Sequence, residues 1–494
     1  MTPRALCWPA AVTGLCAVLL LPLLIVDVPP LLDYPNHLAR LFVLASLPHD
    51  PVLARFYAAH WSVIPNLALD LVGPTLLHTL PVHVAGRLLI AASVLLPVLG
   101  AIAYNTALEE RWWSLGVGLV AYNSCLLAGF LNFSIGIGLA LLLAAAWLHW
   151  RDLRPPWAIG LAIVGAPLLF ACHLMGVVFF ALLIGGAEVS RGITGALRRV
   201  AVLGAVFAAP AALYAMSDLR HLGGDAQFLS PAPKLLQLAT TFVNYNGTLD
   251  TVTAGAAIAL PALCLLLGRG RMPGPAAVAS AGLLAMFLVA PFAWKGTYAL
   301  DTRFAIMLGF MLFAGFVPVR WPAWFARTVT AGLVALFAAR MALLTAAWAA
   351  YAGDVADVRR VLAPVRPGQA VYVAEASLNQ ARQGAWWRRL SNGTRLDEHL
   401  GALVLIEHRA WWPFEFDNVS QQPLETLPPY RALAERVGSL PNQARTAIAD
   451  VCGFDYVLLI EADSVPPLPD ARFRLVSQSG FAALYTIRKC QEDP

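Results

Sequence analysis

Long apolar runs alternate with short polar connections along most of the chain, from residue 5 to residue 350. A helix needs about 20 predominantly apolar residues to cross about 30 Å of hydrocarbon. By that measure the runs bounded by charges, Pro or Gly predict about eleven membrane-spanning helices. They cover residues 5–26, 88–107, 113–130, 132–150, 157–172, 174–189, 199–216, 252–268, 275–294, 303–319 and 328–350.

Two of the apolar pieces need a separate interpretation. No small-residue cleavage site follows the first run, so we interpret it as a span and not as a secretory signal. The piece 66–80, "NLALDLVGPTLLHTL", is short and contains Asp70 and Pro74. It predicts a helix that lies in the membrane interface or dips into it.

Arginines fix the orientation of these spans. With the N-terminus in the cytoplasm, every even-numbered connection is short and carries arginine, as the positive-inside rule expects. These connections are "LEERWW", "HWRDLRPP", "SRGITGALRR", "LGRGRMPG" and "VRWPAWFAR". A crossing at 66–80 would invert all of them, so the charges support an interfacial helix there. Eleven spans place everything after Tyr351 outside.

Composition supports a membrane protein. Hydrophobic residues make up 59% of the 494 and charged residues 13%, and the mean hydropathy is +0.67. Such a chain is a polytopic helical membrane protein and not a water-soluble domain. The net charge of +5 forms no basic cluster, which argues against a nucleic-acid partner.

The polar C-terminal region predicts a separate small domain. Its start, "DVADVRRVLAPV", has a helical pattern, and "AVYVAEA", "ALVLIEH", "DYVLLIEAD", "FRLVSQ" and "FAALYTIRK" resemble strands. We therefore divide the chain into a membrane domain, 1–353, with an external loop at 27–87, and a periplasmic α/β domain, 354–494. In an oxidising periplasm Cys452 and Cys490 form either a disulfide or two separate thiols, and both readings stay open.

The first external loop carries the densest candidate chemistry. In "LLDYPNHLAR", a helix from Pro35 to about Leu47 would place apolar residues on one face and His37 and Arg40 on another. This pattern predicts an amphipathic helix along the membrane surface. Asp33 is then either a general base beside cations that hold a phosphate, or an N-terminal helix cap with a local salt bridge.

Other polar residues gather at the outward ends of the predicted spans. Each one alone is typical of a hydrogen-bonded packing residue. Polar groups at membrane depth are costly, however, and the inward side carries only arginine-rich loops, so together they indicate a site that opens outward. They are Asn132, His173, Lys295, Asp301 and Arg303.

These features together resemble the GT-C superfamily of lipid-sugar-dependent glycosyltransferases, in particular its protein mannosyltransferase (family 39-like) branch. The resemblance rests on an acidic residue after the first span, Asp33, and on "IPNLALDLVG", similar to a proline-started segment of that branch. "AGRLLIAASVLL" follows, with Arg87 where the branch carries an arginine at a span start. Tyr34 stands where a second acid is usual.

The resemblance implies an inner-membrane enzyme of the bacterial cell envelope. It would move a sugar from a polyprenyl-phosphate donor to an envelope glycan, lipid or protein on the periplasmic side, with inversion and with Asp33 as base. Arg40, His37, Lys295 or Arg303 would stabilise the leaving phosphate, and Asp70 would pair with Arg87. The sequence names no cofactor and leaves a divalent metal ion open.

A second class of function stays open beside the transferase. The chain would then be a non-catalytic membrane transporter, or an envelope-assembly component whose C-terminal domain binds a periplasmic partner. Transporters tend to carry ionisable groups near mid-membrane. Here these groups cluster at span ends, which favours the glycosyltransferase.

Overall fold

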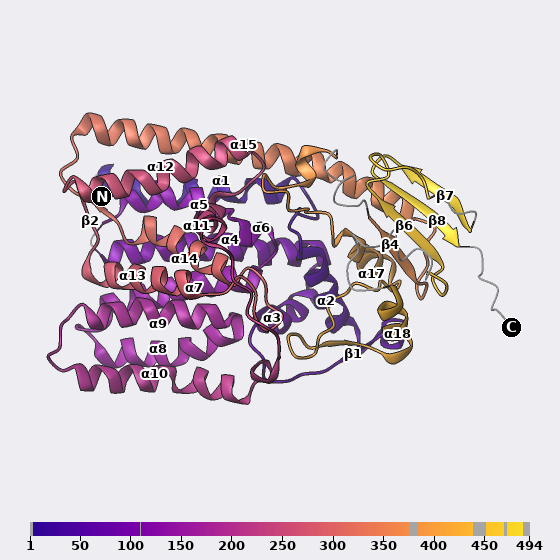
Figure 1. The fold of residues 1–494 in the computed structure, drawn as a ribbon, viewed down its shortest axis with the longest axis horizontal. Helices are drawn as coiled ribbons and strands as arrows, with labels where there is room; N and C mark the ends of the chain where they lie inside the picture. The colour runs from indigo at the N-terminus through magenta and orange to yellow at the C-terminus, as the bar shows by residue number, and fades with distance from the viewer. Residues whose placement is uncertain (1–2, 109, 376–383, 438–450, 469–471, 488–494) are drawn as a thin grey trace. The chain divides into compact units, whose positions relative to one another are not determined.

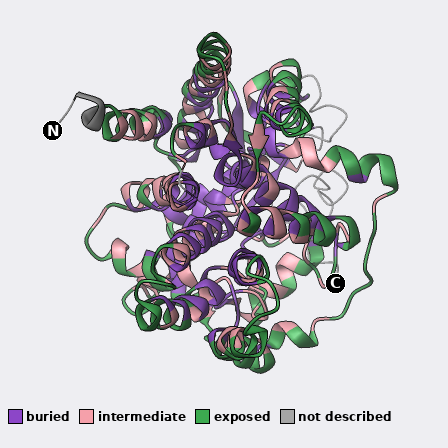
Figure 2. Ribbon diagram, turned by 90° about the vertical axis from the view of Figure 1, so that its left-hand side faces the viewer, coloured by how far each residue is buried: buried purple, intermediate pink, exposed green. Residues whose placement is uncertain are grey.

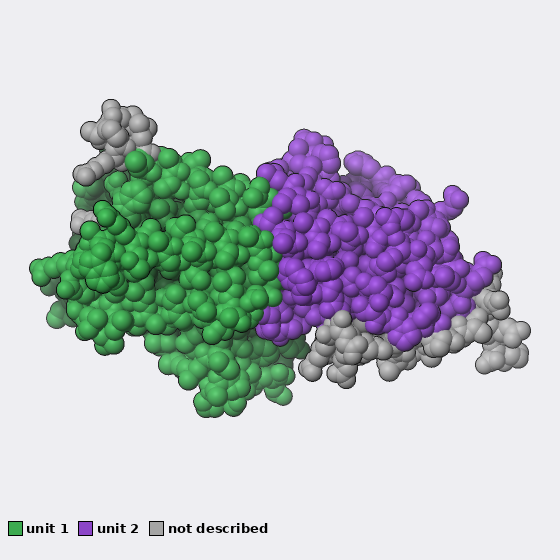
Figure 3. Space-filling model, turned by 90° about the horizontal axis from the view of Figure 1, so that it is seen from above, with its two compact units in different colours: residues 1–22, 62–69, 89–344 green, residues 23–61, 70–88, 345–494 purple. Residues whose placement is uncertain are grey.

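A computed structural model describes residues 3–108, 110–375, 384–437, 451–468 and 472–487 (Figure 1). The chain forms two compact units, coloured separately in Figure 3. Unit 1 comprises residues 1–22, 62–69 and 89–344, and unit 2 comprises residues 23–61, 70–88 and 345–494. Most of the 27–87 loop, apart from residues 62–69, therefore belongs to the same unit as the C-terminal region.

Apolar helices make up most of unit 1. By length and composition, seven helical stretches of the described residues are long and apolar enough to cross a membrane. These are Cys7–Leu24 (α1, Pro3–Leu20, with η1, Leu21–Leu24), α4 (Val82–Ala107), α7 (Leu131–Trp150), α8 (Pro155–Cys172), α10 (Ala196–Met216), α12 (Gly247–Leu266) and α15 (Ala323–Leu362). The two long helices α4 and α15 contribute residues to both units.

Shorter elements complete unit 1. The expected spans at 174–189, 275–294 and 303–319 are helices of 15 or 16 residues, α9 (Leu174–Val189), α13 (Gly274–Val289) and α14 (Leu300–Ala314). The others are η4 (Asp218–His221), α11 (Pro231–Leu236), η5 (Gln237–Phe242), and the paired strands β2 (Gly270–Arg271) and β3 (Val317–Pro318). The count of eleven spans stays a prediction.

The expected span at 113–130 is not one continuous helix. It is broken into η3 (Trp112–Val117), α5 (Gly118–Ala121) and α6 (Ser124–Leu127). Asn123 adopts an extended conformation and its side chain accepts a hydrogen bond from the backbone N–H of Leu126, which starts α6 afresh. Gly129 then takes a φ of 91° and ends the segment. The apolar pattern did not reveal these two breaks.

Small residues in the stretch "GIGLAL", residues 136–141, allow helices of unit 1 to approach closely. A Cβ on Gly138 would lie 2.4 Å from the backbone carbon of Leu96 in α4. One on Gly176 of α9 would lie 3.2 Å from the Cα of Gly136 in α7. The small side chains of "GIGLAL" therefore serve helix packing.

Many exposed positions on these helices carry large apolar side chains. Only 11% of the α10 span is buried, against 67% of α7, and residues such as Leu197 and Val200 are exposed. Figure 2 shows the contrast, with exposed positions on the outer faces of the peripheral helices. Large apolar faces of this kind need lipid as their solvent, which supports a membrane protein.

Unit 2 joins the first external loop to the C-terminal α/β region. From the loop come α2 (Tyr34–Ser46), η2 (Leu53–Arg55), β1 (Tyr57–Ala59) and the short helix α3 (Ala68–Leu77), which begins in unit 1. The C-terminal region adds η6 (Trp386–Arg388), η7 (Leu400–Ala402), α17 (Leu403–His408), β5 (Leu424–Thr426) and α18 (Pro428–Val437). Strand β1 pairs with β5 in antiparallel register, so the loop and the C-terminal region share a sheet.

A four-stranded sheet forms the core of the C-terminal region. Its strands are β4 (Val371–Ala374), β6 (Tyr456–Ile460), β7 (Phe473–Ser479) and β8 (Ala482–Ile487), in the order β4-β6-β8-β7. The pair β4 and β6 is parallel and the other pairs are antiparallel. Four of the five expected strands are therefore confirmed.

The fifth expected strand, "ALVLIEH", is wrong. Residues 400–408 form η7 and α17, whose apolar side chains are buried all round. A short apolar run does not distinguish a strand from a buried helix, and leucine favours a helix. The domain division at residues 353 and 354 also falls inside α15, one helix of 40 residues.

Candidate functional site

The carboxylate of Asp33 does not cap the helix that follows it. Asp33 occupies the N-cap position of α2, but its side chain makes no capping hydrogen bond. Its Oδ1 instead lies 3.3 Å from Nε2 of His399, and the two side chains are 17% and 12% exposed. The expected alternative of a cap with a local salt bridge is therefore wrong, because the partner lies far away in sequence.

An aromatic side chain packs against His399 and against the next turn of α2. The ring of Phe416 makes edge contacts with His399 and with His37, with centroid distances of 5.1 and 5.6 Å. The amide of Asn36 holds this segment, since it donates to the carbonyl of Phe414 at 2.8 Å and accepts from the N–H of Phe416 at 3.0 Å. The first turn of α2 thus fixes the chain at 414–416.

Arg40 does not face water or an open site. It is 1% exposed, and its guanidinium pairs with Asp70 through Nε–Oδ1 at 2.6 Å and Nη2–Oδ2 at 3.4 Å. Its Nη1 donates to Gln422 Oε1 at 3.2 Å and to His37 Nδ1 at 3.1 Å. These partners engage Nε and both Nη atoms, so direct contact with a phosphate does not fit this side chain.

His37 is a neutral ring in this setting. Its burial, together with the positive charge of the neighbouring Arg40, lowers the pKa of His37 well below the usual range. The expected role of His37 as a cation therefore does not fit. The amphipathic surface helix is also corrected, because α2 is buried on its polar face as well as on its apolar one: Asn36 is 0% exposed.

Arg87 lies in a different set of contacts from the one expected. Its Nη1 is 3.7 Å from Oδ1 of Asp27, and the pairing with Asp70 is wrong because Arg40 takes that carboxylate. The neighbouring Gly86 admits the Tyr34 hydroxyl, which a Cβ there would meet at 2.1 Å. This close approach of α4 to the start of α2 helps to hold Asp33 in place.

Glu407 holds a further ionic group in unit 2. It accepts from His83 Nε2 at 2.9 Å and from Arg359 Nη2 at 2.8 Å, while Arg359 Nη1 also reaches Asp27 Oδ2 at 3.4 Å. Burial by itself would raise the pKa of Glu407, but the hydrogen bonds from His83 and Arg359 outweigh it and lower that pKa to about 2. The ends of α4, α15 and α17 are tied together here.

The second ionic cluster of unit 2 lies at the C-terminal ends of the two parallel strands, β4 and β6. Glu375 follows β4 and Glu461 follows β6, so both stand at the same edge of the sheet. Arg395 lies 3.3 Å from Glu375, 3.4 Å from Glu461 and 3.0 Å from Asp397, and Arg389 lies 3.0 Å from Glu461. The three acids are 0% exposed, and burial raises the pKa of Glu375 well above its usual range.

Two of the candidates in unit 1 act as packing and capping groups. Asn132 donates to the carbonyl of Asn66 at 2.7 Å and accepts from the N–H of Leu69 at 3.2 Å, which fastens the 66–69 loop to the start of α7. His173 separates α8 from α9, and its Nδ1 accepts from the N–H of Met175 at 3.0 Å. It is therefore a helix cap.

The structure brings His173 and Arg303 to the same aromatic side chain. Phe133, the residue after Asn132, makes an edge contact with His173 at 5.5 Å. The guanidinium of Arg303 lies 5.8 Å from the Phe133 ring and 4.8 Å from that of Phe130, within the range of a cation–π contact. Two of the five outward polar candidates, His173 and Arg303, thus contact the same ring.

Asp301 and Lys295 lie in other surroundings. Asp301 is 0% exposed and its Oδ2 pairs with the ammonium of Lys234 at 3.1 Å, so its charge is already compensated. Lys295 has a φ of 51°, and its Nζ donates to the carbonyl of Arg220 at 2.9 Å. Its ammonium also lies 5.3 Å from the ring of Trp294.

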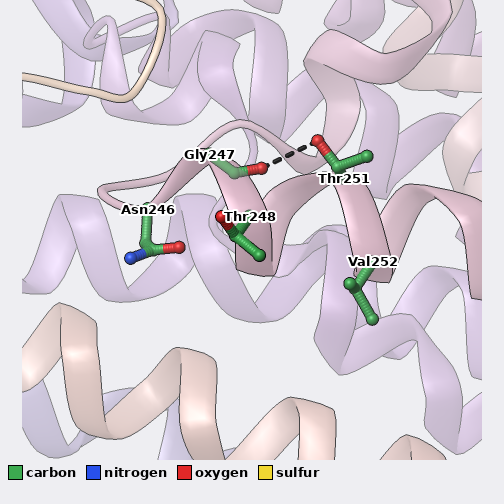
Figure 4. Close-up of a pocket in the computed structure, with 5 residues that line it drawn as sticks. All are labelled: Asn246, Gly247, Thr248, Thr251 and Val252. Atoms are coloured by element: carbon green, nitrogen blue, oxygen red, sulfur yellow. Dashed lines mark hydrogen bonds between the residues drawn. The ribbon is translucent and has the colours of Figure 1, made fainter.

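A depression of about 630 Å³ opens beside the first turn of α12 in unit 1 (Figure 4). Asn246, Gly247, Thr248, Thr251 and Val252 line it. Asn246 caps the helix by accepting from the N–H of Leu249, and the Thr251 hydroxyl donates to the carbonyl of Gly247. None of the residues expected from the sequence lines this depression.

Metal and disulfide chemistry were both left open by the sequence. Among the described residues, no group of three or more His, Cys, Asp or Glu side chains is placed to hold a metal ion. The described neighbours of Asp33 thus do not form a metal site, and we derive no step through a metal. Cys490 lies outside the described residues, so its pairing with Cys452 stays a prediction.

Sequence reasoning missed His399, Phe416 and Asn36 as parts of the Asp33 site. The first two lie more than 360 residues away, in stretches without a recognised motif. The one available signal was "WWPFEFDN", an aromatic-rich stretch with acidic residues in a polar external region. Helical spacing places Asn36 on the polar face of α2, but no pattern indicates that its amide binds the backbone at 414–416.

Comparison with known proteins yields a likeness of fold. No protein-family model and no curated protein sequence matches the chain. Among solved structures, it is similar to the crystal structure of ArnT from Cupriavidus metallidurans bound to undecaprenyl phosphate, with a TM-score of 0.53 and 11% identity. The likeness covers 96% of this chain and 97% of ArnT. At this identity the likeness shows the fold alone, and the chain shares that fold with ArnT over nearly its whole length.

Proposed function

We propose that the chain is an integral-membrane glycosyltransferase that moves a sugar from a polyprenyl-phosphate donor to a hydroxyl group of an envelope acceptor. The fold that it shares with ArnT, a protein whose crystal structure holds undecaprenyl phosphate, supports this class of donor. The observation that carries the proposal is the side chain of Asp33. It is a partly exposed carboxylate at a helix start, not used for capping, with an imidazole as its partner.

The proposed reaction is an inverting displacement. Asp33 takes the proton of the acceptor hydroxyl while the hydroxyl oxygen attacks the anomeric carbon of the sugar. The bond between that carbon and the phosphate oxygen breaks, and its electron pair leaves with the lipid phosphate. A positioned base of this kind contributes roughly 10²–10⁴-fold to a rate. Asp33 ends the step protonated and returns the proton to water.

The leaving lipid phosphate needs positive charge. Arg40 does not fit this role, because Asp70 already compensates its charge. The roles of Lys295 and Arg303 stay predictions of the sequence. We place the reaction on the periplasmic side of the inner membrane, in keeping with the arginine-rich connections on the other side.

Envelope glycans and lipids test the proposal. Mass spectrometry would compare a deletion strain with the same strain carrying the wild-type chain, Asp33→Asn or Asp27→Asn. Asp27 is a matched control, since it lies on the same loop and is 57% exposed. We expect the product peak that the deletion removes to return with wild type and Asp27→Asn but not with Asp33→Asn.

Two results would contradict the proposal. An Asp33→Asn protein that is present at the wild-type level and restores the peak excludes Asp33 as the base. A deletion that changes no glycan or lipid, but abolishes uptake or export of a solute, favours the transporter instead.

A further inference from the structure

The contact of Asp33 with His399 is one of several contacts between the 27–87 loop and the C-terminal region, and it is made by one pair of atoms. His399 stands just before η7, and its carbonyl accepts from the N–H of Ala402 at 3.0 Å, which anchors its backbone. Its ring is walled by Trp412 and Phe416, with centroid distances of 6.1 and 5.1 Å. The ring is therefore held in one orientation, with Nε2 toward Asp33.

The surroundings of the ring select its tautomer. Nδ1 of His399 is buried and has no hydrogen-bond partner among the described residues. A buried N–H without an acceptor is costly, whereas a bare ring nitrogen loses less. The neutral ring therefore carries its proton on Nε2 and donates it toward Oδ1 of Asp33. This contact engages Oδ1 of Asp33. Oδ2 is then the oxygen that accepts the proton of an acceptor hydroxyl.

The first turn of α2 holds both ends of this arrangement. Asp33 contacts His399, and Asn36, three residues later, fixes Phe416 through two hydrogen bonds. Phe416 in turn packs on His399. Residues three apart lie on the same side of a helix, so one helix turn aligns the carboxylate, the imidazole and the aromatic wall. A pure packing contact would not need the ring nitrogen to meet the carboxylate.

We propose that His399 is a positioning residue for Asp33: its Nε2–H contacts Oδ1 and holds the carboxylate in one rotamer, with Oδ2 directed to the acceptor hydroxyl. This inference rests on the proposed function, because it gives Asp33 the role of base. It places a functional side chain in the C-terminal region, where the sequence indicated only a folded domain.

Two substitutions separate positioning from packing. His399→Phe keeps a flat ring between Trp412 and Phe416 but removes the donor. His399→Gln loses the ring but places an amide N–H near the position of Nε2. The assay is the peak that deletion of the chain removes from the envelope profile, measured as initial rate of appearance after induction and divided by the amount of folded protein.

We expect His399→Phe to lower this rate roughly tenfold to a hundredfold, as loss of a hydrogen bond to a charged group does. His399→Gln should recover most of the rate although it is the less well packed variant. In an Asp33→Asn background, His399→Phe should cause no further loss, because its effect passes through Asp33.

The outcomes distinguish the two proposals. If Asp33→Asn itself leaves the rate unchanged, the proposed function fails. If Asp33→Asn lowers the rate but His399→Phe does not, or if His399→Gln is the worse variant, only the positioning role is overturned. Thermal unfolding in detergent identifies variants whose loss comes from misfolding, and a His399→Phe protein that is as stable as wild type but slow supports positioning.

Discussion

Two clusters of charged side chains in unit 2 differ in how completely their charges are enclosed. Behind β4 and β6, Arg395 pairs with three acids, and all four side chains are at most 3% exposed. At the start of α2, Asp33 has the His399 imidazole as its described partner, and both remain partly exposed. The first cluster is built as a sealed network, whereas the second leaves a carboxylate reachable.

This difference helps to distinguish charged residues that stabilise the fold from charged residues that can act on a substrate. A buried ion pair with every partner in place contributes mainly to folding, and its disruption leaves uncompensated charge. A partly exposed carboxylate held by one oriented donor retains room for a substrate. By this criterion Arg40, Asp301 and Asp397 belong with the sealed groups, and Asp33 does not.

We expect the largest effect on activity from Asp33→Asn. We expect the largest effect on stability from a substitution in the Arg395 cluster. We expect Asp33→Asn to lower the rate per folded molecule roughly 10²–10⁴-fold, since the amide does not accept the proton. Its melting temperature in detergent should stay close to that of wild type. Rate assays paired with thermal scans on the same preparations check this, and a large fall in melting temperature would break the comparison.

Arg395→Met should destabilise unit 2 by about 3–5 kcal/mol, because it removes the buried partner of Asp397 and one of the two arginine partners of Glu461. Urea unfolding followed by tryptophan fluorescence measures the change. Arg431→Met is the matched control, since Arg431 is 41% exposed and pairs only at the surface with Glu425. An equal loss of unfolding free energy in the two variants would show that the Arg395 cluster is not enclosed.

Acid should weaken the Glu407 contacts before the protein as a whole unfolds. The pKa of Glu407 is about 2 in the folded chain and 4.5 ordinarily, so its stabilisation is full above about pH 4.5 and is lost as pH falls toward 2. The contribution is about 2 kcal/mol, below the full linkage value because the side chain is 20% exposed. Glu407→Gln should reduce the pH dependence of the unfolding free energy between pH 5 and pH 3. An unchanged slope would show that Glu407 is not the source of that dependence.

The smallest effect belongs to Arg40→Lys. A lysine keeps the charge beside Asp70 but loses the two-point contact and the bonds to Gln422 and His37. We expect a loss of about 1–2 kcal/mol in stability. The dependence of rate on donor concentration should not change, because Arg40 does not bind the phosphate in this account. A raised requirement for donor would return Arg40 to the site.

Periodicity and composition predicted the membrane helices, the short helix at 68–77 and four strands of the C-terminal sheet. These features depend on local spacing of apolar residues, which a single sequence displays. Sequence analysis did not predict the breaks at Asn123 and Gly129 or the helix at 403–408, because helix capping and a short buried apolar run leave no periodic signal.

The site was predicted in part, for a physical reason. Asp33 could be named because its chemistry stands at a distinctive place after the first span. Its partner could not, since His399 reaches it only through tertiary folding, and Asp70 was assigned to Arg87 although Arg40 takes it. Which cation meets which acid depends on the packing of distant segments, and sequence spacing does not contain that information.

Release of the lipid product tests the central claim most directly. Purified protein in lipid vesicles would be given the lipid extract of the deletion strain, in which unused donor accumulates, together with envelope material as acceptor. Mass spectrometry would follow free polyprenyl phosphate over time. The account predicts steady release with wild type and release slower by roughly 10²-fold or more with Asp33→Asn. Equal release by the two proteins, or none by wild type, would contradict it.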